Sequence, residues 1–161
     1  MITLRWLLKH VVLPLLPFFI GASIRCLFHN GFSINAFSPA ELSFSMAMLT
    51  MVISLNASRL NNPNLRETIS SLYQLGAFVF LILFSWAIFI EADKINLLNN
   101  LFKLVEQHIN SGKVISVNDF PKRVFEFDSI LSKLRVATIS LSLAVVPLSI
   151  YSNKKFQLEE I

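Results

Sequence analysis

The residues from Ile69 to Ile90 form a stretch without a charged side chain, rich in phenylalanine and leucine. As an α-helix at 1.5 Å per residue it would be about 33 Å long, which matches the roughly 30 Å of hydrocarbon in a bilayer. Tyr73 near one end and Trp86 near the other fit the aromatic residues that gather at the two membrane interfaces. The segment is therefore predicted to cross a membrane.

The composition of the whole chain indicates several such spans. Of its 161 residues, 54% are hydrophobic and only 15% are charged, whereas soluble domains carry about 25% charged residues. So few charges cannot cover a water-facing surface. The 14 basic residues, which leave a net charge of +4, are dispersed along the chain. They fit the flanks of membrane helices, and we expect no direct contact with nucleic acid.

A first span is predicted over residues 6–28, with Lys9 and Arg25 near its ends. Pro14 and Pro17 lie inside it and should bend it or leave carbonyls without their usual donors. A cleavable signal peptide is the alternative, because basic residues precede the apolar stretch. No Ala-x-Ala-like cleavage site follows that stretch, so we favour a retained helix.

The second span is predicted to begin at Ser38-Pro39-Ala40-Glu41 and to run to about Leu60. The serine hydroxyl at the N-cap, the proline at the first helical position and the glutamate at the third form a capping box. Pro63 is expected to stop this helix, and Asn64 with Glu67 to start the next. So short a connection forces the two helices into an antiparallel hairpin.

A fourth span is predicted over Val136–Ser152, which is short and contains several serines and threonines as well as Pro147. Its hydroxyl content indicates packing among the other helices, and an interfacial helix is the alternative. The fold class is thus all-α: a single membrane domain over residues 1–161 with four transmembrane helices.

Residues 91–135 are predicted to be a helical extramembrane insertion between the third and fourth spans. Ile95–Ile109 has the periodicity of an amphipathic helix, Val114–Val117 is a candidate extended segment, and a following helix is expected to run directly into the fourth span. In one interpretation these helices lie on the membrane surface or on each other. In the other they form a small sensing or docking domain.

The orientation is weakly encoded, because lysine and arginine are nearly balanced between the two sides. The short hairpin with Arg59 and Arg66 and the tail with Lys154 and Lys155 are typical of segments retained in the cytoplasm. We therefore expect both termini inside and residues 91–135 outside.

The sequence offers little chemistry. Cys26 is the single cysteine, the three histidines are isolated from one another and from carboxylates, and no glycine-rich phosphate loop is present. Transporters usually keep ionisable residues at mid-membrane, and the four apolar cores contain none. We expect no catalytic residue, no cofactor and no metal site.

A stripe of small, mostly hydroxyl-bearing residues runs along the second span. Its members recur at spacings of three and four: Ser43, Ala47, Thr50, Ser54 and Ala57. Small residues let two helices approach closely, and hydroxyl groups can form hydrogen bonds across the contact. The stripe is either an internal packing seam or the lining of a pore or subunit contact. The fourth span offers a partner seam in Ala137, Ser140, Ala144 and Pro147.

In outline the chain resembles the small four-span inner-membrane proteins of bacterial anti-phage systems, such as the RexB exclusion protein and the Kiwa membrane subunit. The shared points are the length, an early proline-containing span, an arginine-bearing hairpin (here Arg59 to Arg66) and a short charged tail. The resemblance is one of topology, so no residue role is transferred.

The resemblance implies a multi-pass protein of the bacterial inner membrane. Its expected role is that of a non-enzymatic, homo-oligomeric subunit that senses infection or depolarises the membrane. The expected partners are membrane lipid, further copies of the chain and a partner protein such as a cytosolic effector. Two alternatives stay open: an immunity protein that binds a pore-forming bacteriocin within the bilayer, and an assembly subunit of a larger membrane complex.

Overall fold

The computed structural model describes residues 8–28, 37–111 and 120–156. A π-helical turn, Leu8–Val12, leads into α2 (Leu13–Phe28), and the other helices are α3 (Pro39–Ala57), α4 (Pro63–Ser111) and α5 (Phe120–Phe156). The predicted all-α fold is confirmed, because all four α-helices are long and apolar enough to cross a membrane. The first two residues of the predicted first span and the candidate extended segment Val114–Val117 lie outside the described residues.

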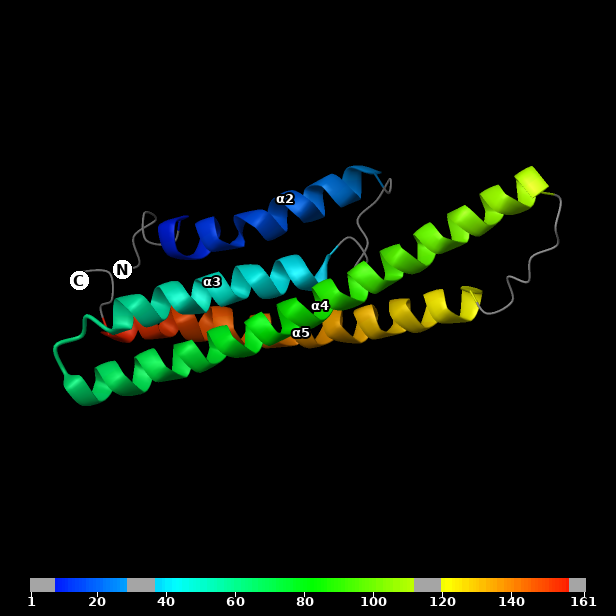
Figure 1. Cartoon of the computed structure of the whole chain (residues 1–161). Helices are drawn as coiled ribbons and strands as arrows, with labels where there is room; N and C mark the ends of the chain where they lie inside the picture. Colours follow the sequence, from blue (N-terminus) through cyan, green and yellow to red (C-terminus); the bar gives the residue numbers. More distant parts are fainter. Residues whose placement is uncertain (1–7, 29–36, 112–119, 157–161) are drawn as a thin grey trace.

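Helix α3 is the centre of the bundle. In its most apolar stretch 61% of the residues are buried, against 17% to 22% in the corresponding stretches of the other three helices. It packs against α2, α4 and α5, and Figure 1 shows it lying among them. The helices alternate in direction, so that the start of α2 and the end of α5 lie at the same end as the hairpin between α3 and α4 (Figure 1).

The first turns of α3 and of α4 are each capped by a side chain. Ser38 has an extended backbone and its hydroxyl accepts a hydrogen bond from the Glu41 amide at 3.5 Å, so the predicted N-cap of α3 is confirmed. The predicted start of the next helix was wrong. Asn62 Oδ1 accepts from the amides of Asn64 and Leu65 at 3.1 and 3.3 Å, and Pro63 is the first helical residue. Asparagine at the N-cap and proline at the first position are both favoured, because proline lacks an amide that would need a partner there.

The prolines of the first span accompany an irregular start. The π-helical turn at Leu8–Val12 directly precedes α2 and contains His10, four residues before Pro14. The ring of a helical proline displaces the carbonyl four residues earlier, and a π turn is one way in which a helix absorbs such a disturbance. Pro14 itself is buried in the bundle.

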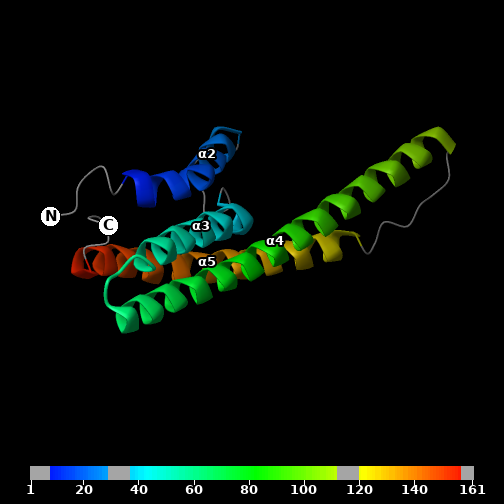
Figure 2. The same ribbon diagram turned by 60° about the vertical axis from the view of Figure 1, so that its left-hand side comes forward.

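Helices α4 and α5 are much longer than a bilayer is thick. The 49 residues of α4 correspond to about 74 Å at 1.5 Å per residue. We call the parts of the two helices that extend past α2 and α3, residues 91–111 and 120–135, the arm (Figures 1 and 2). The predicted helix over Ile95–Ile109 is part of α4, which continues from the third span because no glycine or proline interrupts it between Ala77 and Ser111. The expectation that the following helix runs directly into the fourth span is confirmed by α5.

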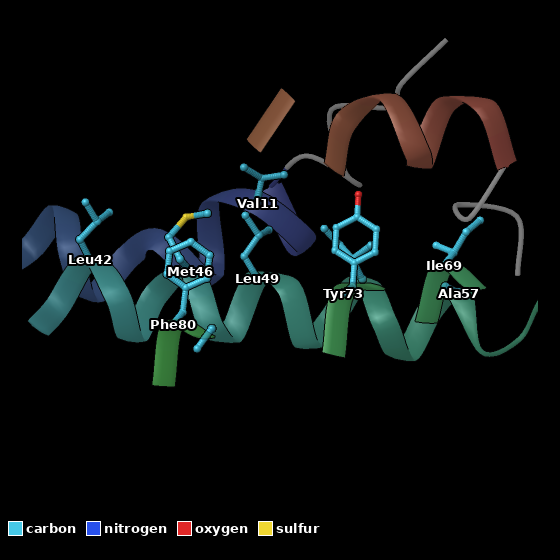
Figure 3. Packing of buried hydrophobic residues seen from close by; sticks show 10 residues of the cluster. Val11, Leu42, Met46, Leu49, Ala57, Ile69, Tyr73 and Phe80 are labelled. Carbon is cyan, nitrogen blue, oxygen red and sulfur yellow. The ribbon is translucent and has the colours of Figure 1, made fainter. Parts of the chain in front are cut away.

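The hydrophobic core lies between α3 and α4, with α2 and α5 closing it from the other sides. Met46, Leu49 and Ile53 of α3 are fully buried, and Phe80 of α4 is 2% exposed. Figure 3 shows Tyr73 of α4 standing upright in this core with its hydroxyl directed away from its own helix. That hydroxyl donates a hydrogen bond to Ser152 Oγ of α5 at 2.9 Å.

Large apolar side chains cover the outside of the bundle, which is the arrangement that a lipid environment requires. Even the central helix α3 keeps one exposed apolar stripe, formed by Phe44, Met48, Met51 and Leu55. On α4, Leu72, Leu75, Phe78 and Ile82 are half or more exposed. Because lipid tails are as apolar as these side chains, burying them inside would gain little.

We predict that Tyr73→Phe destabilises the protein by about 1 kcal/mol, because it keeps the packing but removes a buried hydrogen bond between α4 and α5. Thermal unfolding in detergent micelles would measure the loss. Tyr151→Phe is the matched control, since Tyr151 is 57% exposed. Equal effects of the two changes would contradict a structural role for the Tyr73 hydroxyl.

Candidate functional site

The small-residue stripe of α3 is buried within a single chain. Ser43, Ala47, Thr50, Ser54 and Ala57 are all at most 4% exposed. In this structure the stripe therefore fills contacts between helices of one subunit. Lining a pore with these side chains would require α3 to separate from its neighbours.

Each hydroxyl in the stripe has a hydrogen-bond partner. Ser43 Oγ lies 3.3 Å from Thr138 Oγ1 of α5, and Ser54 Oγ lies 2.9 Å from Ser70 Oγ of α4. Thr50 bonds back to carbonyls of its own helix at 2.9 and 3.0 Å. Thr50 also faces Gly76 of α4, where an added Cβ would lie 3.5 Å from Thr50 Cγ2, an ordinary van der Waals contact. The stripe thus joins α3 to α4 and α5 by the packing of small side chains and by hydrogen bonds between hydroxyl groups.

The candidate partner seam on α5 lies on a different face from the one that packs. Ala137, Ser140 and Ala144 are exposed in the single chain. The buried residues of α5 lie beside them: Leu131, Leu134, Thr138, Ser142, Ser149 and Ser152. Thr138 and Ser142 donate to the carbonyls four residues earlier, at 2.8 and 2.7 Å.

A sequence signal for the correct face of α5 does exist. The apolar stripe of the arm, which includes Phe127, Leu131 and Leu134, continues at spacings of three and four into Thr138 and Ser142. Because α5 is one unbroken helix, the face that packs in the arm also packs in the membrane. Considering the fourth span in isolation, from Val136 onward, hides this continuity.

A second set of polar contacts lies where the arm leaves the bundle, and we call it the junction network. It contains Arg25, Ser38, Glu41, Glu91, Lys94, Asp128 and Arg135. These residues come from the end of α2, the start of α3, the middle of α4 and the first half of α5. In an alternating bundle these four positions fall at one membrane face, so their charges can meet.

Arg25 and Glu41 tie α2 to α3 at this face. Arg25 Nη1 donates to Glu41 Oε1 at 2.9 Å, and Nη2 contacts the second carboxylate oxygen. The two side chains are 32% and 33% exposed, as suits the edge of a membrane. A Cβ on Gly21 would overlap the Glu41 carboxylate, so glycine at this position lets the carboxylate lie against α2. The sequence identified Glu41 only as a capping residue.

The remaining contacts of the junction network join the arm to the start of α3. Ser38 Oγ donates to Glu91 Oε1 of α4 at 3.1 Å, and Arg135 Nε of α5 donates to the Phe37 carbonyl at 2.7 Å. One step further out, Lys94 Nζ lies 2.6 Å from Asp128 Oδ1, which joins α4 to α5. A movement of either arm helix therefore changes contacts with the start of α3.

A large apolar groove of about 960 Å³ opens between α2, α3 and α5. Its wall includes Leu15, Phe18, Met46, Ile139 and Val146, and Cys26 borders it. Within residues 8–28, 37–111 and 120–156, no three histidine, cysteine, aspartate or glutamate side chains come together in a way that could hold a metal ion.

Comparison with known proteins returns no relative: no family model, no curated protein and no solved structure matches the chain. The physical features of the stripe, the junction network and the arm therefore carry the functional argument.

We predict that Ala47→Leu destabilises the bundle by about 1–3 kcal/mol, because three extra carbons cannot fit at a position that is 4% exposed. Chemical or thermal unfolding in detergent would measure this loss. The control is Met48→Leu, the adjacent position on the lipid-facing side, which is 42% exposed. An unchanged stability for Ala47→Leu in the inserted protein would contradict the tight packing of the stripe.

Proposed function

We propose that this protein is a non-enzymatic, oligomeric membrane subunit that transmits a conformational change between its arm and its membrane bundle. One observation carries the proposal: α4 and α5 pass without a break from the bundle into the arm, and the junction network ties both to the start of α3. A rigid helix moves as a unit, so displacement at the arm tip reaches the bundle.

The packing of the bundle suits such transmission. Helix α3 contacts α4 through small side chains and hydroxyls, such as the pair Ser54 and Ser70. These contacts exchange partners over small displacements more easily than interlocked bulky side chains do, because less volume has to be cleared. A shift of α4 would thus alter how α3 sits against α5.

We further propose that the setting is anti-phage defence in the bacterial inner membrane. The arm would stand outside the cytoplasmic membrane, and the termini and the α3–α4 hairpin would face the cytoplasm, where an effector protein could bind. The outcome of the signal would be depolarisation of the membrane or activation of that effector. The topology-level resemblance to four-span defence proteins supports this setting, as does an arm that reaches away from the bundle.

The proposal predicts that breaking the continuity of α4 at the junction abolishes protection. Ala92 is exposed and follows Glu91 in the unbroken helix, so Ala92→Pro interrupts α4 without filling a packed site. Bacteria that carry the protein would be challenged with a panel of phages, and plaque formation and membrane potential would be followed. We expect plating efficiency to rise at least about tenfold with Ala92→Pro and to stay unchanged with the helix-compatible Ala92→Leu.

Full protection by an inserted Ala92→Pro variant would contradict transmission through α4. If the unaltered chain protects against no phage but protects cells from a pore-forming bacteriocin, the immunity function would replace the proposed one. A chain that protects against neither and is degraded unless other membrane proteins are co-expressed would indicate an assembly subunit instead.

The orientation gives a separate prediction. In a Cys26→Ser background, Asn100→Cys places a thiol on the exposed polar side of the arm. A membrane-impermeant thiol reagent should label it in intact spheroplasts, because the arm is expected outside the cytoplasmic membrane. Labelling that requires opened membranes would place the arm in the cytosol and make it a docking platform for a cytosolic partner.

A further inference from the structure

One apolar face of α4 in the arm is largely uncovered. It consists of the exposed residues Ile95, Phe102, Val105 and Ile109 and the half-buried Leu98, which together we call the arm stripe. Ile95 is 57% exposed, Phe102 68% and Ile109 75%. These values are high for residues that leave the membrane with the arm, because in water a contiguous apolar face of this kind normally has a partner.

The arm stripe is not the side of α4 that faces α5. Lys94 marks that side through its contact with Asp128 of α5. Leu97, Leu101 and Leu104 follow Lys94 at spacings of three and four and are half-buried. The apolar arc of α4 is therefore wider than one neighbouring helix can cover, and Figures 1 and 2 show α4 and α5 diverging toward the tip of the arm.

A lipid surface does not suit the arm stripe. Because α4 is continuous, the arm follows the direction of the membrane span and leads away from the bundle formed with α2 and α3 (Figure 1). Ile109 lies 19 residues beyond Ile90, or about 28 Å along the helix. The polar side of this segment contains asparagines and Gln107 with one lysine and one glutamate, whereas helices that lie on anionic lipid are rich in basic residues.

We propose that the arm stripe is the contact surface for a second copy of this chain, which pairs with it as a parallel coiled coil. The stripe has the required heptad spacing, with Ile95, Phe102 and Ile109 at the first apolar position and Leu98 and Val105 at the second. Isoleucine at two of the three first positions and leucine at one of the two second positions match the pattern that favours two parallel strands, whereas Phe102 and Val105 depart from it.

The membrane supplies the register and the direction of this pairing. Two copies inserted with the same orientation raise their arms on the same side and to the same height. The axis of a two-fold dimer then stands perpendicular to the bilayer, so each stripe residue lies opposite the same residue of the second copy. In a cell the dimer would form without any change in the bundle.

This inference names the surface behind the oligomer of the proposed function, and to that extent it rests on that proposal. The test measures association of two copies directly, as a disulfide-linked dimer of the full chain in native membranes. In a Cys26→Ser background, Ile95→Cys would be oxidised and analysed by non-reducing gel electrophoresis. We expect most of the protein to run as a covalent dimer. Asn96→Cys, at the same height on the exposed polar side, should give at least about fivefold less.

Ile95 also distinguishes the direction of pairing, because it lies near one end of the stripe. In an antiparallel dimer Ile95 would lie opposite Ile109, so Ile95→Cys would not form a disulfide. Absence of the Ile95→Cys dimer, or equal yields from the two cysteine positions, would overturn the proposal. A disulfide from Ile95→Cys to another protein, in place of a second copy, would overturn it as well.

A second variant pair tests the stripe itself. Phe102→Glu, introduced into the Ile95→Cys protein, should lower the dimer yield at least about fivefold, because it places a charge in the centre of the seam. Phe125→Glu is the matched control, since Phe125 is at least as exposed, at 75% against 68% for Phe102, but belongs to α5 and lies outside the stripe. Equal yields in the two variants would overturn the role of the stripe. A dimer that forms in a chain without any effect on phages would refute the proposed function and leave this contact standing.

Discussion

The structure depends on close packing of α3 against the long helices α4 and α5. In a lipid bilayer this packing is not driven by the hydrophobic effect, because lipid is itself apolar. In a bilayer, helices associate through van der Waals contact and bonding between them, because lipid tails compete equally well for leucine and phenylalanine. The chain solves this by concentrating small residues and hydroxyls on α3. Ser43 and Ser54 each meet a hydroxyl of another helix, and Thr50 faces Gly76 of α4. The bulky residues are left for lipid.

The charged residues follow from the same constraint. A carboxylate or a guanidinium is costly in hydrocarbon, so the chain keeps such groups at the level where the bundle ends. There the alternating directions of the helices bring Arg25 and Glu41 together with Glu91 and Arg135. Contacts made at the edge of the membrane hold the arm to the start of α3. The same network therefore fixes the bundle and couples it to the arm.

The number of spans and the cap at Ser38 could be predicted from sequence, because apolar length and capping residues are local signals. The continuity of α4 could not be predicted in the same way. Glu91, Asp93 and Lys94 interrupt the hydropathy and resemble a boundary, yet they are compatible with a helix and no glycine or proline breaks it. The packing face of α5 was missed because two stripes of small residues lie side by side. Only the continuation from Leu131 and Leu134 into Thr138 decides between them.

The burial of the α3 stripe also limits how an oligomer could act. Residues such as Ser43, Thr50 and Ser54 are enclosed by helices of their own chain, so a water-filled path along them would cost the hydrogen bonds that join α3 to α4 and α5. An assembly through the arm leaves these bonds intact and places α4 at the centre, in contact with its copy outside the membrane and with α3 inside it. Of the two roles that the small-residue stripe suggested, its burial favours an internal packing seam over a pore lining. A signal received at the arm would reach the opposite face of the membrane through the shift of α4 against α3.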